Sequence, residues 1–173
     1  MRQVSRARAE ELELAAFGAD AGPPDFVATV RAPEWEDWLR GEAGSGGPET
    51  VADPRRVDGN AAWWSRAKLA RRVERGSRLY VCCRGRLRLW VALRPIGNPF
   101  ETDQEGRDER GLWIPLCIDG SPPDGGPWWQ PVTIEAGMPG FRGLRRRWWP
   151  RDAEIRCPDW RTSALGLEEG EQL

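Results

Sequence analysis

Alternating apolar and polar residues in the middle of the chain predict a β-hairpin. Residues 79–83 favour a strand, and the short turn Arg84-Gly85 follows them. Apolar residues then recur at every second position: Leu87, Leu89, Val91 and Leu93. The positions between them hold Arg86, Arg88, Trp90 and Ala92. This period of two predicts a returning strand with one apolar face and one arginine-tryptophan face, either solvated or a binding surface.

The segment before the hairpin predicts a basic helix. Residues 62–73 are rich in Ala, Leu, Arg and Lys, with apolar residues near helical spacing. Gly76 is suited to the left-handed conformation that commonly ends a helix. The segment also holds the pair Trp63-Trp64 and the chain's one lysine, Lys68. We therefore expect residues 61–96 to form the unit around which the chain is organised.

Apolar runs elsewhere predict shorter elements. Residues 26–30 predict a strand, and Pro33 is suited to the first turn of a helix over 34–39. Further strands are predicted over 112–118, 131–134 and 144–149. Pro115 favours an edge position or a bulge for the first of these. The expected fold class is α+β, mainly β.

The expected domain organisation has three parts. Residues 1–22 predict an N-terminal helix and linker, residues 23–162 one domain, and residues 163–173 an acidic tail. Within the domain, residues 41–59 are rich in Gly, Pro, Ser and Asp and predict a long loop.

Composition agrees with a globular chain and excludes several classes of protein. Of the 173 residues, 39% are hydrophobic and 31% charged, which is unlike a disordered protein. No apolar run approaches the roughly 18 residues needed to cross a membrane. The charged N-terminus lacks the apolar core of a signal peptide, so we expect a cytoplasmic location without membrane association.

Charge is segregated along the chain although the formal net charge is only −1. Residues 55–94 carry twelve basic and two acidic side chains, a net of +10, and residues 140–161 carry a net of +4. The intervening residues 95–139 carry −6, and residues 23–54 carry −5. Such segregation favours a basic surface that faces polyanions, unless folding interleaves the blocks.

The absence of histidine from the sequence narrows the possible chemistry. It removes histidine metal ligands and Ser-His or Cys-His catalysis. Cys82 and Cys83 are neighbours in a predicted strand, so their side chains should point to opposite faces and not share a metal. We expect reduced thiols, no metal, no cofactor and a protein that is not an enzyme.

Tryptophan and arginine supply the candidate binding residues. The chain has eleven tryptophans, which are either core residues or outward indoles that stack on bases beside phosphate-binding arginines. Arg145 to Arg147 with Trp148-Trp149 fit a phosphate contact beside a stacking platform, or an edge strand protected by charge. The candidate nucleic-acid-binding residues are Trp63, Trp64, Arg66, Lys68, Arg86, Arg88, Trp90, Arg145, Arg146, Arg147, Trp148 and Trp149.

The order of these elements resembles the PUA-like superfamily, especially its ASCH and EVE types. The matching residues are Trp63, Trp64, Arg66 and Lys68, then Gly76-Ser77-Arg78-Leu79-Tyr80-Val81, and then Gly85-Arg86-Leu87-Arg88. Ser77 stands where the family often has Asp, and Leu89-Trp90 replaces a Gly-aromatic pair. The resemblance covers residues 26–149 in outline and 61–94 in motif. It implies a small, strongly bent β-barrel with peripheral helices that binds RNA or a modified base.

We therefore expect a nucleic-acid-binding module for RNA or DNA, with recognition of a modified base as a further hypothesis. One alternative is a small hydrolase of modified nucleosides, because some ASCH-type domains are amidohydrolases with a Lys-Thr-Glu set. Thr29 matches the threonine of that set, but Arg31 stands in the neighbourhood where the set has its lysine. Lys68 would have to act in place of that lysine. Another alternative is a protein-interaction module that uses exposed tryptophans and acidic loops. The sequence leaves the oligomeric state open.

Overall fold

The computed structural model describes residues 22–41, 62–65, 71–95, 107–108, 111–112, 114–119 and 129–161. For 62–65 and for the strands within 107–117, the backbone alone is described. The described part is mainly β with one α-helix, which confirms the expected α+β class. The N-terminal helix and the acidic tail that the sequence predicts lie outside the described residues, as does most of the long loop after residue 41.

The described elements are one α-helix, one 3-10 helix and ten strands. The helices are α2 (Ala32–Leu39) and η2 (Arg151–Ala153). The strands are β1 (Phe26–Thr29), β2 (Ala62–Ser65), β3 (Arg78–Cys83), β4 (Arg86–Arg94), β5 (Arg107–Asp108), β6 (Gly111–Leu112), β7 (Ile114–Ile118), β8 (Trp129–Thr133), β9 (Leu144–Arg146) and β10 (Ile155–Arg156).

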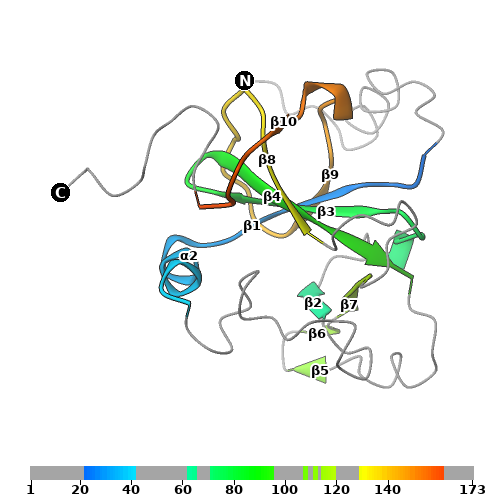
Figure 1. Ribbon diagram of the computed structural model, residues 1–173. Helices are drawn as coiled ribbons and strands as arrows, with labels where there is room; N and C mark the ends of the chain where they lie inside the picture. Colours follow the sequence, from blue (N-terminus) through cyan, green and yellow to red (C-terminus); the bar gives the residue numbers. More distant parts are fainter. Residues whose placement is uncertain are drawn as a thin grey trace, which may run out of the picture.

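Eight of these strands form one hydrogen-bonded sheet (Figure 1). The order along its main path is β10-β8-β4-β3-β1-β9, while β7 joins β4 and β2 joins β7. Among the described strand pairs only β1 and β3 run parallel, and their connection begins with α2, as parallel pairing requires a crossover. Among the described residues the path does not return from β9 to β10. A closed barrel is therefore not shown.

The predicted hairpin is confirmed. β3 and β4 pair antiparallel across a two-residue turn, in which Arg84 has φ 50° and Gly85 φ 71°. Two positive φ values in succession match the turn whose twist suits a two-residue hairpin. Gly76, with φ 90°, also has the expected left-handed backbone, just before β3 begins. The predicted strand 26–30 and helix 34–39 correspond to β1 and α2.

The prediction of one apolar and one arginine-tryptophan face for β4 is wrong, because the strand contains a bulge. Val81 pairs with Leu89 but Cys82 pairs with Leu87, so Arg88 is the extra residue. A bulge reverses the faces of the residues beyond it. Leu87 therefore packs with Trp90 in one core cluster, whereas Leu89 packs in the other. Both faces of the strand are buried.

The helix predicted over residues 62–73 is contradicted at its start. Residues 62–65 form β2, which pairs antiparallel with β7 from Ala62 opposite Cys117 to Ser65 opposite Ile114. The two tryptophans favour a strand, and pairing with a distant segment outweighs the helical propensity of the alanines and arginines. In this pairing Trp64 lies opposite Pro115. The partner strand is distant in sequence, so no periodicity within 62–73 could reveal the pairing.

Two hydrophobic clusters cover the two faces of the sheet. One contains Trp35, Trp38 and Trp160. Trp160 packs edge-on against the other two, with ring centroids 5.2 and 6.4 Å away, whereas Trp35 and Trp38 are tilted by 44° at 5.8 Å. The other contains Tyr80, Trp90, Trp149 and the residues around them. Cys83 belongs to the first cluster and Cys82 to the second, which confirms that their side chains point to opposite faces. Tryptophan is thus a major core residue of this fold.

A buried carboxylate fastens one end of the sheet. The side chain of Asp25, only 1% exposed, accepts hydrogen bonds from the backbone N–H of Arg78 at 3.0 Å and from Arg147 Nε at 2.9 Å. Arg151 donates to both of its oxygens, at 2.8 and 2.9 Å. Three segments far apart in sequence therefore meet at one charge. The carboxylate of Asp25 can be buried because each of its two oxygens accepts two hydrogen bonds.

A second carboxylate lies beside this cluster. Glu154 accepts a hydrogen bond from Tyr80 Oη at 2.6 Å and from Trp149 Nε1 at 3.3 Å. The guanidinium of Arg78 lies 3.5 Å from Glu154 and 4.2 Å from the centre of the Trp90 ring. Burial, and then the charges of Asp25 and Glu154, raise the pKa of Tyr80 above its ordinary value. The phenol consequently stays protonated as a donor.

We expect Asp25→Ala to lower the free energy of unfolding by about 3–5 kcal/mol, because it leaves Arg147 and Arg151 without their buried counter-charge. Urea denaturation followed by circular dichroism measures the loss. Asp152→Ala is the matched control, since Asp152 is exposed and should change stability by no more than about 0.5 kcal/mol. Equal effects of the two substitutions would contradict the role given to Asp25.

Tyr80 is the only tyrosine, so phenolate absorbance reports on this site alone. Its raised pKa means that the unfolded chain ionises first, and folding stability should fall as pH rises above about 10. In an alkaline titration we expect the phenolate signal to appear together with loss of circular dichroism. The chain unfolded in guanidinium should titrate near pH 10. A phenolate that titrates near pH 10 in the folded protein would contradict the burial.

Candidate nucleic-acid interface

A groove of about 400 Å³ lies between the chain that enters β1 and the segment that precedes β3. We call it the arginine groove. Its lining residues are Gly22, Pro24, Arg71, Arg72, Val73, Glu74 and Arg146. Three of these seven residues are arginines and one is a glutamate. Phosphate is a fitting ligand for such an arrangement, because the arginine fork binds its oxygens in pairs.

Each wall of the arginine groove is set by local structure. Arg146, the last residue of β9, lies opposite Phe26 in the sheet, and its guanidinium carbon is 5.9 Å from the centre of that ring. On the other wall, Ser77 and Glu74 close a turn reciprocally. The Ser77 hydroxyl accepts from the Glu74 N–H at 3.0 Å, and the Ser77 N–H donates to the Glu74 carbonyl at 3.0 Å.

Ser77 is also the position where the sequence departs from the PUA-like pattern. Its side chain is fully buried, and its carbonyl accepts the N–H of Leu93 at 2.8 Å. A short hydroxyl can satisfy a turn N–H as an aspartate would, without adding a buried charge. The serine therefore closes the turn before β3 without a carboxylate.

The structure disperses the basic aromatic segment 145–149. Arg146 lines the arginine groove, whereas Arg145 is exposed and lies over Phe141, 5.1 Å from its centre. Arg147 is bound to Asp25, and its Nη1 also donates to the carbonyl of Trp149. Of the two tryptophans, Trp149 is buried and Trp148 partly exposed. One phosphate-binding surface formed by all five side chains is thus not what the structure shows.

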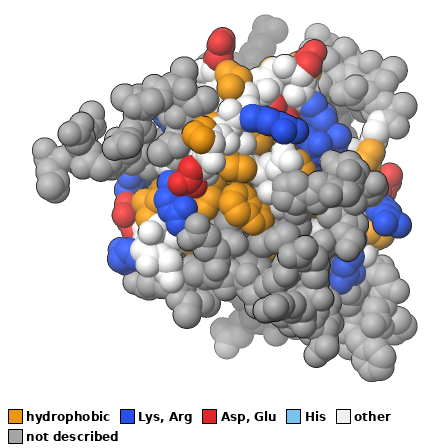
Figure 2. Space-filling view, in the orientation of Figure 1, with side chains coloured by type: hydrophobic (Ala, Val, Ile, Leu, Met, Phe, Trp, Pro, Cys, Tyr) orange, Lys and Arg blue, Asp and Glu red, His pale blue; other side chains and the backbone are white. Residues whose placement is uncertain are grey.

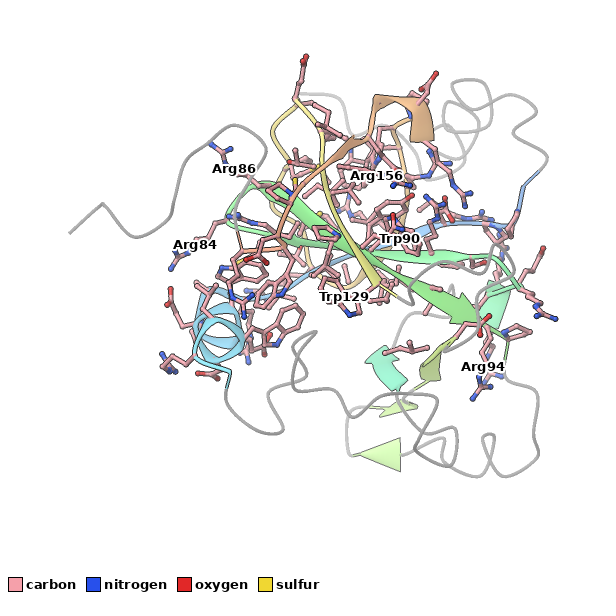
Figure 3. The ribbon with its side chains drawn as sticks, in the orientation of Figure 1. Arg84, Arg86, Trp90, Arg94, Trp129 and Arg156 are labelled. Carbon is pink, nitrogen blue, oxygen red and sulfur yellow. The ribbon has the colours of Figure 1, made fainter. Side chains whose placement is uncertain are left out.

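The candidate residues of β4 are not at the groove either. Arg88 is 2% exposed, with its guanidinium carbon 5.1 Å from the Trp35 ring, and Trp90 is 3% exposed beneath Arg78. Arg86 is partly exposed but lies at the hairpin turn, opposite Cys83. Following the paired residues across the sheet from Arg146, through β1 and β3, leads to Val91 in β4, which is not at the turn. Figure 3 shows Arg86 and Arg94 at opposite ends of the strand.

The remaining candidates are described in part or not at all. Trp63 and Trp64 lie in β2, where the backbone alone is described. Arg66 and Lys68 lie outside the described residues. Arg71 and Arg72 were not among the predicted residues, although their adjacency within the +10 block was a signal. Their proximity to Arg146, more than seventy positions away in the chain, depends on the fold and has no local signal.

The surface seen in Figure 2 combines arginine with exposed hydrophobic side chains. Hydrophobic side chains gather in the middle of this face, and a group of basic side chains lies above them. Figure 3, in the same orientation, places Trp129 in the middle and Arg156 above it. Trp129 is partly buried against the core and Arg156 is exposed.

Comparisons with known protein families, with curated proteins and with solved structures give no match. The resemblance to PUA-like domains therefore stays a prediction.

Other kinds of site find no support in the described part of the chain. No group of three or more His, Cys, Asp or Glu side chains there could hold a metal ion. No described helix is long and apolar enough to cross a membrane. Cys82, Cys83 and Cys157 are buried and form no disulfide. Burial above all raises the pKa of Cys82 to about 12, which keeps its thiol protonated and unreactive.

We expect iodoacetamide at pH 8 to label Cys82 only after the protein unfolds, because the thiol is both buried and protonated there. Peptide mapping by mass spectrometry reports each cysteine separately. The same chain in guanidinium is the control, in which all four cysteines should react. Rapid labelling of Cys82 in the native protein would show that the site is neither buried nor protonated.

Proposed function

We propose that this protein binds nucleic acid, with backbone phosphates seated in the arginine groove, and that it acts by binding and not by catalysis. The observation that carries the proposal is the convergence of Arg71, Arg72 and Arg146 on one surface groove. Two of these arginines come from the +10 block and the third from the +4 block. The fold thus brings arginines from the two basic blocks of the sequence together at this groove.

A polyanion suits the arginine groove better than a small neutral ligand. Its described lining is mostly polar, with Pro24 and Val73 as its larger apolar residues, whereas pockets for small molecules are lined mainly by apolar and aromatic side chains. Arg71 and Arg72 are exposed, so they can follow a phosphate backbone with little desolvation. Electrostatic contacts of this kind supply affinity without reading sequence. The proposal accordingly does not choose between RNA and DNA.

The finer parts of the proposal have different support. A modified base as the preferred ligand follows only from the resemblance to PUA-like domains. A cytoplasmic location accords with three buried cysteines that form no disulfide. The hydrolase alternative depends on Lys68, outside the described residues, and the protein-interaction alternative on loops that also lie there.

Replacing Arg71, Arg72 and Arg146 together with Ala should weaken oligonucleotide binding by about tenfold or more at low salt. It should also reduce the slope of log affinity against log salt by about 2–3, since each lost phosphate contact removes roughly 0.7–0.9. Fluorescence anisotropy with labelled RNA and DNA at several salt concentrations measures both quantities.

Arg84→Ala is the control for a lost surface arginine, because Arg84 lies at the hairpin turn and pairs with Glu36. It should leave both affinity and salt slope nearly unchanged. An unchanged affinity in the triple variant, or equal losses in the triple variant and the control, would count against the groove. Binding of a protein partner that survives nuclease treatment, with no affinity for any oligonucleotide, would favour the interaction-module alternative.

A further inference from the structure

The two faces of β9 differ in chemistry. Its alternation directs Leu144 and Arg146 to the face that holds Phe26, and Arg145 to the opposite face. Arg146 lines the arginine groove, while the guanidinium of Arg145 lies over Phe141. β9 is also the last strand of the sheet path among the described residues. A chain that crosses this strand would meet a phosphate-binding groove on one side and an aromatic surface on the other.

That aromatic surface is built on a fixed base. Trp148 packs edge-on against Phe141 and Trp149, with ring centroids 5.7 and 5.1 Å away. Trp149 is in turn held by its hydrogen bond to Glu154 and by an edge-on contact with Tyr80 at 5.2 Å. The indole of Trp148 nevertheless stays partly exposed, as does the Phe141 ring. It is therefore an oriented aromatic group that solvent still reaches in part.

Charge around this surface favours an anionic partner. Residues 136–151 contain five arginines and no acidic residue, and two of the five, Arg147 and Arg151, are paired with Asp25. Arg142 and Arg145 are exposed, and the guanidinium of Arg145 lies over the Phe141 ring. An apolar peptide would gain contact with the rings but nothing from these charges. A nucleotide matches both, because its base has an aromatic face and its phosphate a negative charge.

From this juxtaposition we propose that the protein prefers single-stranded nucleic acid, with an unpaired base stacked at Trp148 and a neighbouring phosphate in the arginine groove. The inference rests on the proposed function and adds the form of the ligand. In a duplex the faces of each base are covered by its neighbours, so an indole outside the helix has nothing to stack on. A single strand offers those faces whatever its sequence, and stacking on an aromatic side chain strengthens binding by roughly fivefold to more than a hundredfold.

Three probes of about 12 nucleotides separate the two contributions: a single strand, the duplex of the same sequence, and an abasic strand that keeps only sugar and phosphate. The wild-type protein should bind the single strand most tightly. Trp148→Leu keeps apolar volume at the site but removes the stacking face. It should lower affinity for the single strand at least fivefold, towards that for the abasic strand, and leave abasic affinity and its salt slope unchanged. Trp148→Phe, which retains an aromatic face, should recover most of the loss.

The possible failures point to different conclusions. If Trp148→Leu binds the single strand as tightly as wild type, the stacking inference is overturned while the arginine groove stands. If it weakens all three probes equally, Trp148 supports the fold or the groove and is no base platform, which also overturns the inference. If the wild-type protein binds none of the probes, the proposed function fails and the inference with it. Thermal unfolding of each variant shows whether the comparison is made between folded proteins.

Discussion

The buried charge of Asp25 is the constraint on which the rest of this end of the molecule depends. A carboxylate that is almost fully removed from water is costly unless several donors surround it, and here four hydrogen bonds from three residues do so. Those donors fix the start of β3 and the chain on either side of Trp149. The arginine groove lies between the same segments, because Pro24 precedes Asp25 and Arg146 precedes Arg147. The segments that form the groove are therefore held in place by a buried interaction next to it.

This constraint also explains why three consecutive arginines have three different roles. In an extended segment Arg145 and Arg146 point to opposite faces, and β9 ends where Arg147 turns towards Asp25. Arg147 neutralises a buried charge, Arg146 faces the groove, and Arg145 covers an aromatic ring. The two interpretations of the segment, phosphate contact and charged edge strand, are thus compatible, since different residues would serve each.

Local patterns were sufficient for the elements whose partners lie nearby in sequence. The hairpin β3–β4 was predictable because period-two alternation and an Arg-Gly turn agree, and α2 because Pro33 and an acidic first turn mark its start. The bulge at Arg88 and the pairing of β2 with β7 depend on distant partners, and no period within either segment encodes them. The groove was unpredictable for the same reason. Arg71 and Arg146 become neighbours only through β1, which joins β3 to β9.

Residue type alone was the weakest guide to function, because arginine and tryptophan also build this core. Arg88 lies buried against Trp35, Arg78 covers Trp90, and Arg161 lies 4.4 Å from the centre of the Trp160 ring. Such pairs are stabilising because an indole face attracts a cation, most strongly where water is excluded. At a surface, arginine can hold the face of a base by the same attraction, and a phosphate through charge-assisted hydrogen bonds. Whether an arginine-tryptophan pair lies in the core or at the surface of this protein is decided by the register of the strands.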